Sequence, residues 1–318
     1  MSTTEILNRA NLKVDLFTLV EKVSNHYKLG PISSFAPIEV GYEDLNIKLR
    51  AGNGAYVIKV FSKGKSYRVV KSYVRGLVEF AKVEIPCPEV LESKNGLVYK
   101  FTESSSSAYL CVTIFFRGQS FSAQKITGAD LVKLTRYISR IHQASFPITK
   151  AYDSWGTINL LREFDKKYSC LAKRDFDLVY PVVQAFSKLP FAKFTKSIVH
   201  GDLQKSNILK NSNGGYCILD LGCLDYNYSI LDLAIFLSQF GYGNSLVKNK
   251  KIYKIVINEY MQSRELNEFE LTALPDLIRA TYAIYLISAN YAIQSGDTSS
   301  QTLNWLKRSR RGLALYQY

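Results

Sequence analysis

Three polar residues in the middle of the chain have types and spacing that suit phosphoryl transfer. In the segment SIVHGDLQKSNILKNSNGGYCILDLG, which begins at Ser197, Asp202 is followed by Asn207 and then by Asp220. Phosphoryl transfer needs an acceptor hydroxyl held in line and a Mg²⁺ ion that neutralises charge on the phosphates. Because carboxylate and amide oxygens ligate Mg²⁺, Asn207 and Asp220 could hold the ion. Asp202 could then accept the proton of the attacking hydroxyl.

Two short apolar segments flank these polar groups. The pair at 198–199 leads into a polar loop, and the run at 216–219 ends on Asp220. Between them, the Asn-Gly-Gly sequence at 213–215 is a strong turn signal. The sequence therefore predicts a single β-hairpin that carries the three polar groups at its open end.

This segment resembles the aminoglycoside phosphotransferase and choline kinase superfamily, including its homoserine kinase-type branch. The family pattern is His-Gly-Asp, four residues, Asn, and then an apolar strand that ends in Asp-x-Gly. The matching positions are His200, Gly201, Asp202, Asn207, Asp220 and Gly222. The resemblance implies that Asp202 is the catalytic base and that Asn207 and Asp220 are metal ligands. It also implies that His200 supports the loop.

Two positions of the motif bear on the kind of acceptor. Protein kinases usually carry arginine where Gly201 stands, so the glycine favours the small-molecule branch. Many members carry His-Pro-Gly where this chain has Gln-Lys-Ser at 204–206, which leaves the acceptor open. Asp and Asn beside turns are also common because their side chains bond to nearby backbone. Six matching positions in order nevertheless favour a phosphotransfer site over coincidental turn chemistry.

The strands before residue 62 contain a lysine that the resemblance places on ATP. Residues 55–61 alternate like a strand, and Lys59 lies among apolar neighbours. A lysine is costly to bury unless an anion pairs with it. By resemblance, Lys59 contacts the α- and β-phosphates, and the hairpin that contains Gly41 and Asn46 covers the nucleotide. The alternative is an outward-facing lysine on an edge strand.

A helix predicted over residues 66–83 and the segment after residue 114 complete the expected nucleotide site. In kinase-like folds this helix brings a glutamate to the strand lysine. Glu79 is the helix's acid, but it lies later than the family's glutamate usually does. Either Glu79 therefore pairs with Lys59 or the ion pair is absent. Phe115 and Phe116 occupy the hinge position, where backbone groups and apolar walls would hold adenine.

Strands followed by helices, together with the resemblance, predict an α+β, two-lobed protein-kinase-like fold. We expect a mostly β N-lobe over residues 1–117 and a helical C-lobe over 118–318, which would carry the catalytic hairpin and the acceptor-binding helices. The Asp-Leu-Ala sequence that begins at Asp232 is a further family feature. Asp232 is a natural N-terminal capping residue, and by resemblance it buttresses the loop.

The chain's charge constrains its partners only weakly. Its 41 basic and 27 acidic residues give a net charge of +14, which favours a solvated basic surface and weakly disfavours polycationic acceptors. The basic clusters at 248–251 and 307–311 are short and lack interleaved aromatic residues, so nucleic-acid binding is not expected.

Cysteine spacing and hydropathy predict the compartment. The five cysteines are scattered and contain no Cys-x-x-Cys pair, which argues against a disulfide framework or a zinc site. The chain shows neither a signal-type segment nor an apolar stretch of membrane-spanning length. We therefore expect a cytoplasmic protein without a membrane partner, whose oligomeric state the sequence leaves open.

These patterns converge on one reaction, with rivals left open. The sequence predicts that the γ-phosphoryl group of ATP moves, with Mg²⁺, to a hydroxyl of a small molecule. The acceptor would be homoserine-like, an amino alcohol, a sugar or an antibiotic. One alternative is a nucleotide-binding regulatory protein with little or no catalysis, and another is an RNA-associated basic protein.

Overall fold

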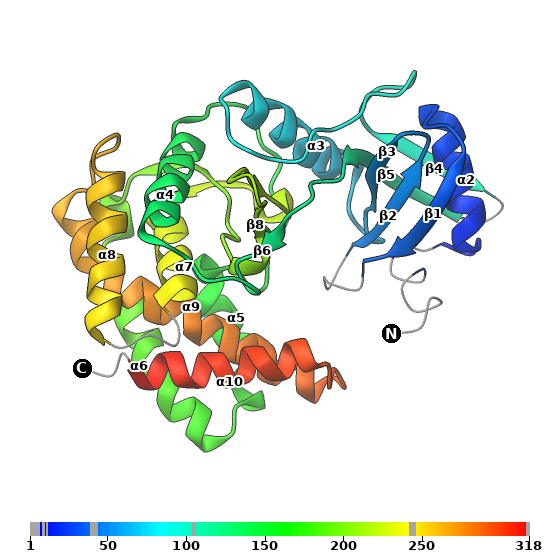
Figure 1. Ribbon diagram of the computed structural model, residues 1–318. Coiled ribbons are helices and arrows are strands. Elements are labelled where there is room, and N and C mark those ends of the chain that lie inside the picture. Colours follow the sequence, from blue (N-terminus) through cyan, green and yellow to red (C-terminus); the bar gives the residue numbers. More distant parts are fainter. Residues whose placement is uncertain are drawn as a thin grey trace. The chain divides into compact units, whose positions relative to one another are not determined.

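The chain folds into two compact units, which are drawn in Figure 1. The computed structural model describes residues 7, 10, 12–38, 44–103, 106–241 and 246–315. Unit 1 comprises Met1–Gln119, Phe146–Ala151 and Lys210–Gly222, and unit 2 comprises Ser120–Ser145, Tyr152–Leu209 and Cys223–Tyr318. The predicted lobe boundary between residues 117 and 118 stays a prediction. Two segments after it, Phe146–Ala151 and Lys210–Gly222, cluster with unit 1.

Unit 1 is built on an antiparallel sheet of five strands in the order β1-β2-β3-β5-β4. The strands are β1 (Ile32–Pro37), β2 (Leu45–Ala51), β3 (Gly54–Val60), β4 (Tyr99–Glu103) and β5 (Ser106–Ile114). Along β2, Leu45, Ile47 and Leu49 are buried and alternate with more exposed residues. This alternation buries one face of the sheet and leaves the residues between them on the other face.

Two helices accompany this sheet. Helix α2 (Leu16–Tyr27) shares the buried core of the sheet through Leu19, Val20 and Val23. Helix α3 (Tyr67–Lys82) begins at Ser66, whose hydroxyl accepts a hydrogen bond from the Val69 N–H. The segment 146–151 joins unit 1 because the Thr149 N–H donates to the Ser72 hydroxyl at 2.8 Å.

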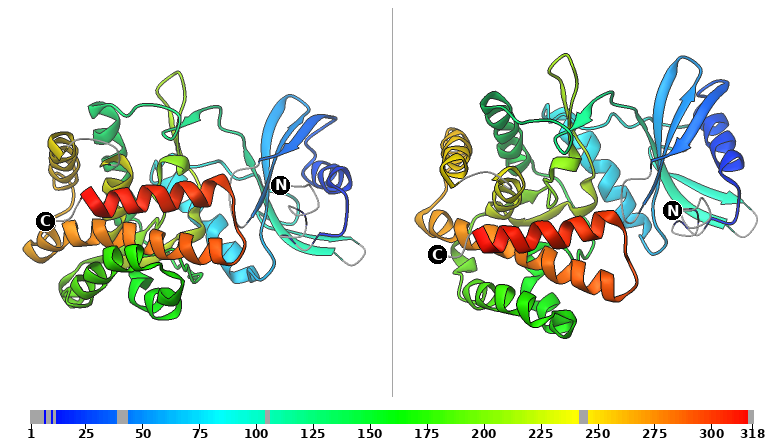
Figure 2. Two further views of the ribbon diagram at one scale, coloured as in Figure 1. Left: turned by 90° about the horizontal axis from the view of Figure 1, so that it is seen from below. Right: turned by 60° about the horizontal axis from the view of Figure 1, so that its bottom comes forward.

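Unit 2 is mostly helical. Its helices are α4 (Gly128–Gln143), α5 (Leu160–Lys167), α6 (Lys173–Ser187), α7 (Ile230–Gly241), α8 (Leu246–Tyr260), α9 (Glu268–Gln294) and α10 (Ser300–Leu315). Helix α9 lies at the centre and packs against α5, α6, α7 and α10. In Figure 2 the orange α9 and the red α10 run side by side. Buried Leu, Ile and Ala side chains along α9 form the core of this unit.

The predicted single hairpin around the motif is wrong. Strand β7 (Lys196–Val199) pairs antiparallel with β10 (Asp225–Tyr228). The segment at 198–199 therefore pairs with β10 and not with the predicted partner, residues 216–219. Strand β9 (Tyr216–Ile218) belongs to another sheet, in the order β6 (Gln119–Ser120), β8 (Ile208–Lys210), β9. The physical reason is that Ile208, only 1% exposed, starts a strand of its own directly after the polar loop.

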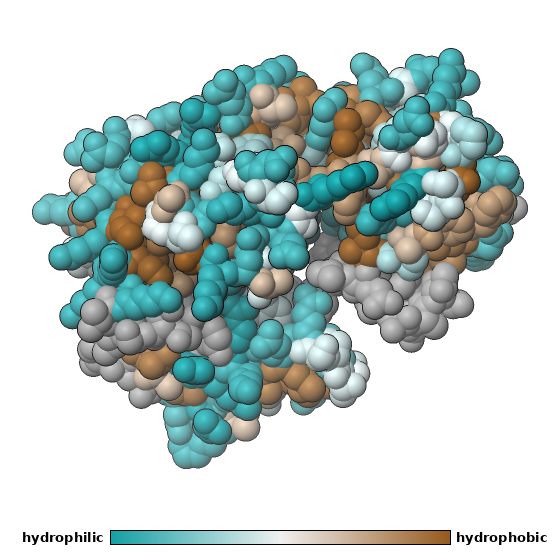
Figure 3. All heavy atoms as spheres, in the orientation of Figure 1, coloured by the Kyte–Doolittle hydropathy of each residue, from teal (hydrophilic) through white to brown (hydrophobic). Residues whose placement is uncertain are grey.

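The described surface is largely hydrophilic on the face shown in Figure 3, where hydrophobic side chains gather only in smaller groups. Among the helices that the structure describes, none combines the length and the apolar character that crossing a bilayer would require.

Candidate active site

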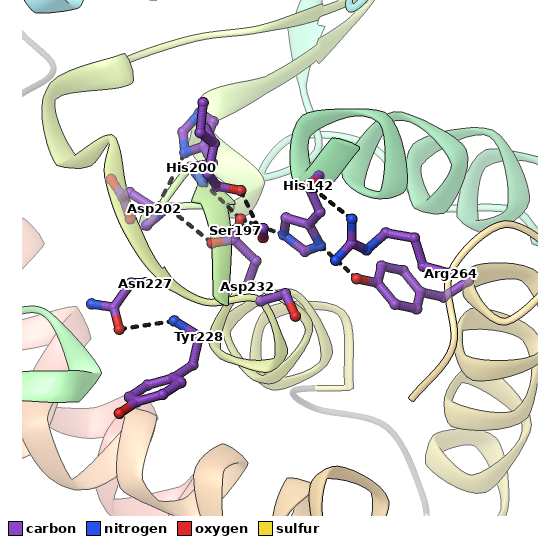
Figure 4. Close-up of polar contacts among 12 residues, drawn as sticks. His142, Ser197, His200, Asp202, Asn227, Tyr228, Asp232 and Arg264 are labelled. Carbon is purple, nitrogen blue, oxygen red and sulfur yellow. Dashed lines mark hydrogen bonds and ion pairs between the residues drawn. The ribbon is translucent and has the colours of Figure 1, made fainter. Parts of the chain in front are cut away.

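The polar loop that follows β7 is held by a buried carboxylate. Asp232, in the first turn of α7, is 0% exposed and accepts hydrogen bonds from the backbone N–H groups of His200, at 2.7 Å, and Gly201, at 2.9 Å. The Nε2 atom of His142 lies 3.1 Å from the same carboxylate, and Figure 4 draws the residues of this contact. The loop therefore starts from a fixed backbone, and Asp232 has the buttressing contacts that the resemblance implies.

Asp232 stays ionised despite its burial. Burial acts to raise the pKa of this carboxyl, but the hydrogen bond from His142 and the charges of His142 and His200 together hold the pKa below its usual range. His142 is itself fixed, because its Nδ1 atom lies 2.7 Å from the Tyr260 hydroxyl. The support of the loop therefore reaches from α7 to α4 and α8.

Loss of this carboxylate should destabilise unit 2. Asp232→Ala leaves the buried N–H of His200, the half-buried N–H of Gly201 and the buried His142 without their acceptor, so we expect the free energy of unfolding to fall by about 3 kcal/mol or more in urea titrations. In the wild type the stabilisation should be present above about pH 4 and be lost as the pH falls, since the folded pKa is depressed. Asp177→Ala, at an exposed aspartate of α6, is the matched control and should change the free energy of unfolding by less than about 1 kcal/mol.

Glycine is required at position 201. Its φ angle is +79°, a region that side chains with a Cβ rarely adopt, and an added Cβ would lie 2.4 Å from the Cys223 carbonyl oxygen. The backbone therefore turns tightly between β7 and Asp202. No other residue fits this turn without moving the segment around Cys223.

Asp202 is oriented by the residues that follow it. Its N–H donates to His200 Nδ1 at 3.2 Å, which fixes the loop against the buried imidazole. The Asn207 amide donates to the Asp202 carbonyl at 3.0 Å and to its carboxylate at 2.7 Å. The Gln204 amide donates to the other carboxylate oxygen. The loop thus brings two of the three predicted residues, Asp202 and Asn207, into direct contact.

This arrangement also sets which way the Asn207 amide points. Because the NH₂ group faces Asp202, the carbonyl oxygen faces away, and it makes no hydrogen bond within the described part of the chain. An amide oxygen in this orientation has the chemistry of a Mg²⁺ ligand.

In unit 1, Lys59 is buried and points toward acids. The side chain, on β3, is 9% exposed, and its Nζ atom lies 3.0 Å from Asp44 and 3.4 Å from Asp220. The alternative of an outward-facing lysine is therefore wrong. Asp220 has a φ of +61° and a side chain that is 47% exposed, so its carboxylate remains accessible beside the lysine.

The Lys59 and Asp44 side chains remain charged despite their burial. Burial acts to lower the pKa of Lys59, but Asp220, Tyr73 and Asp44 outweigh it and raise the pKa well above its usual value. Burial acts to raise the pKa of Asp44, but the ammonium groups of Lys59 and Lys65 hold it below its usual range. Asp44 also accepts from the Ser62 N–H at 2.9 Å.

Glu79 is not the partner of Lys59. It forms an ion pair with Lys82, 3.0 Å away and one helical turn later, on the outer face of α3. The helix instead presents Tyr73 to the lysine, whose Nζ lies 5.2 Å from the centre of that ring. The prediction that made Glu79 part of the nucleotide site through this pair is therefore wrong. Asp44 holds the position, and no periodic or motif signal in the sequence marked it.

The remaining predicted nucleotide contacts lie in unit 1. Asn46 is the register partner of Lys59 across β2 and β3, so the two residues share a face of the sheet. Phe115 follows β5, and its N–H donates to the Ala55 carbonyl at 2.9 Å. Phe115 and Phe116 are both half-buried. Gly41 lies outside the described residues, and the roles of all four in nucleotide binding stay predictions.

Sequence comparison finds distant relatives that span most of the chain. Residues 34–260 match the family model described as the phosphotransferase enzyme family. A homoserine kinase of Brucella ovis is 20% identical over 275 residues, which cover 84% of this chain and 81% of the relative. A homoserine kinase of Paramagnetospirillum magneticum is 21% identical over 289 residues, with 86% and 85% covered.

Solved structures share the fold. An amicoumacin kinase in complex with AMP-PNP, Ca²⁺ and Ami has a TM-score of 0.72 at 16% identity and covers 98% of this chain and 96% of its own. A spectinomycin phosphotransferase in complex with ADP and spectinomycin has a TM-score of 0.70 at 14% identity, with 96% and 98% covered. These matches confirm the predicted kinase-like fold, with its sheet-based unit and its helical unit.

Proposed function

We propose that this protein, which belongs to the phosphotransferase enzyme family, moves the γ-phosphoryl group of ATP to a hydroxyl group of a small molecule. The family assignment confirms the resemblance seen at the His-Gly-Asp motif. The observation that supports the reaction most strongly is the loop in which Asn207 and Gln204 orient the Asp202 carboxylate. Candidate acceptors are a homoserine-like compound, an amino alcohol, a sugar or an antibiotic.

Asp202 would act as the base. A hydroxyl of the acceptor donates a hydrogen bond to the carboxylate, and its proton passes to Asp202 as the new O–P bond forms and the bond between the γ-phosphorus and the bridging oxygen breaks, which releases ADP. The two amide donors hold the carboxylate in one orientation, which lowers the entropic cost of aligning the hydroxyl. Asp202 is half-buried, so an acceptor can reach it.

Asn207 and Asp220 would hold Mg²⁺. The outward carbonyl oxygen of Asn207 and the exposed carboxylate of Asp220 are hard oxygen donors of the kind that this ion prefers. When bound, Mg²⁺ would neutralise charge on the phosphates. The Lys59 ammonium has three hydrogen-bond donors, and Asp44 and Asp220 occupy two of them. The third donor would contact the α- and β-phosphates.

Incubation of the purified protein with γ-labelled ATP, Mg²⁺ and a panel of hydroxyl compounds tests this proposal. The panel contains L-homoserine, 1-amino-2-propanol, glucose and spectinomycin, and the label is followed by thin-layer chromatography. We expect transfer to members of one class. ATP binding without transfer to any hydroxyl would refute the proposal and favour the regulatory alternative.

Asp44 should matter to the reaction, whereas Glu79 should not. Asp44→Asn removes the buried charge that holds Lys59, so we expect kcat/KM for ATP to fall by roughly 10–100-fold in steady-state assays. Glu79→Gln removes a charge from α3 that pairs with Lys82, and it should change kcat/KM for ATP by less than about threefold. Equal losses in the two variants would contradict the pairing.

A further inference from the structure

The catalytic loop of unit 2 contains a half-buried lysine. Lys205, three residues after Asp202, is half-buried, and its Nζ atom lies 5.4 Å from the centre of the Phe240 ring. Among the residues that the structure describes, no carboxylate forms an ion pair with it. Phe240 directly follows Gln239 on α7, so the lysine lies beside the segment that carries Gln239.

Arg308 and Gln239 add further hydrogen-bond donors. The Arg308 guanidinium, on α10, donates to Gln239 Oε1 at 2.8 Å. Gln239 precedes Phe240 on α7 and is 1% exposed, and its Nε2 group has no hydrogen-bond partner within the described ranges. A buried donor without a partner is costly, so such a group favours an acceptor oxygen supplied by a ligand.

Two aromatic rings pack beside this group of donors. Arg308 lies 4.9 Å from the centre of the Trp305 ring, and Trp305 packs against Tyr285 with ring centres 4.9 Å apart. Lys205, three residues after Asp202 in the same loop, contacts Phe240, the neighbour of Gln239, so the donors lie in the surroundings of the base.

We propose that Lys205, Arg308 and Gln239 form an anion subsite that binds a carboxylate or phosphate group of the acceptor. The inference rests on the proposed function and specifies its substrate class. A guanidinium and an amide NH₂ offer donors to the paired oxygens of an oxyanion, and the lysine adds a second positive charge. The acceptor therefore carries its reacting hydroxyl and its anionic group on one small skeleton.

The same residues disfavour an acceptor whose only charge is positive. Trp305 could bind a cation over its ring face, but Arg308 already lies there. A second cation would meet the charges of Arg308 and Lys205 at short range. Polycationic and quaternary-ammonium alcohols are therefore poor fits for this side of the site.

A set of hydroxyl compounds matched in size tests the subsite. KM and kcat are measured with labelled ATP for 4-hydroxybutanoate, 3-hydroxypropyl phosphate, 4-amino-1-butanol and 1-butanol. We expect kcat/KM for one of the two anionic compounds to exceed that of the amine and of butanol by about tenfold or more. The carboxylate and phosphate arms then show which oxyanion is bound. Preference for the amine or for butanol overturns the subsite but leaves the proposed function intact, whereas absence of transfer to every acceptor in both panels counts against the proposed function.

Variants locate the preference at these residues. Arg308→Gln and Lys205→Met should each raise KM for the anionic compound by about tenfold or more, with kcat and KM for ATP changed less than about threefold. Lys307→Gln, which removes the same charge at the exposed neighbour of Arg308, is the matched control and should leave KM unchanged. Titration calorimetry with the anionic compound alone gives a readout that does not depend on turnover. Equal affinity of the wild type and both folded variants for this compound would overturn the proposal.

Discussion

Asp202→Asn should reduce kcat by roughly 10²–10⁴-fold, because the variant cannot accept the proton of the acceptor hydroxyl. The substitution should preserve the loop. An asparagine oxygen can still accept from Asn207, and Gln204 can turn its amide so that its oxygen meets the new NH₂ group. The variant should therefore bind nucleotide and unfold like the wild type.

Single-turnover assays with labelled ATP, together with calorimetric titration of AMP-PNP, separate these effects. A slow turnover with unchanged nucleotide affinity is the expected pair of results. Turnover within about tenfold of the wild type would contradict the assignment of Asp202 as the base, since general-base catalysis contributes more than that. A loss of AMP-PNP binding would instead show that Asp202 shapes the nucleotide site.

The local chemistry of the site could be predicted from the sequence because it lies within a few residues. The spacing between Asp202 and Asn207 is short enough for one loop to bring them together, and the structure shows their hydrogen bond. The pairing of Lys59 with an anionic group could be predicted because a lysine inside an apolar strand is costly to bury without one. The turn at 213–215 was also correctly predicted, since Asn211 closes it by accepting from the Gly215 N–H at 2.8 Å.

Long-range pairing could not be predicted in the same way. Strand β7 pairs with β10, whose sequence Asp-Tyr-Asn-Tyr is not an apolar run, so the local pattern favoured the more apolar β9 as its partner. The partner of Lys59 was missed for a similar reason. Asp44 precedes β2 and meets the lysine only because β2 and β3 pair in this register. Glu79 was considered instead because kinase-like folds usually bring a glutamate from this helix to the lysine. The donors of the proposed anion subsite come from the catalytic loop, α7 and α10, so only the folded chain places them together.

Asp220→Asn should lower kcat by about 10³-fold at ordinary Mg²⁺ concentrations, because it removes the one carboxylate among the proposed metal ligands. An amide oxygen binds Mg²⁺ more weakly than a carboxylate does, so part of the loss should be recovered at high Mg²⁺ or with Mn²⁺. The substitution also takes a negative charge from beside Lys59, which retains Asp44 at 3.0 Å and should stay in place. Activity measured against metal concentration is therefore the informative assay.

Asp225→Asn is the matched control for that assay. Asp225 lies five residues after Asp220, and its carboxylate accepts from the N–H of Tyr226 and from the Asn227 amide, contacts that an asparagine oxygen can partly keep. We expect its metal dependence to match the wild type, while that of Asp220→Asn shifts to higher Mg²⁺. If Asp220→Asn lost activity without any shift in metal dependence, Asp220 would act through Lys59 rather than on the ion. In that case the KM for ATP of Asp220→Asn should rise by about as much as that of Lys59→Met, because both substitutions would weaken the same phosphate contact.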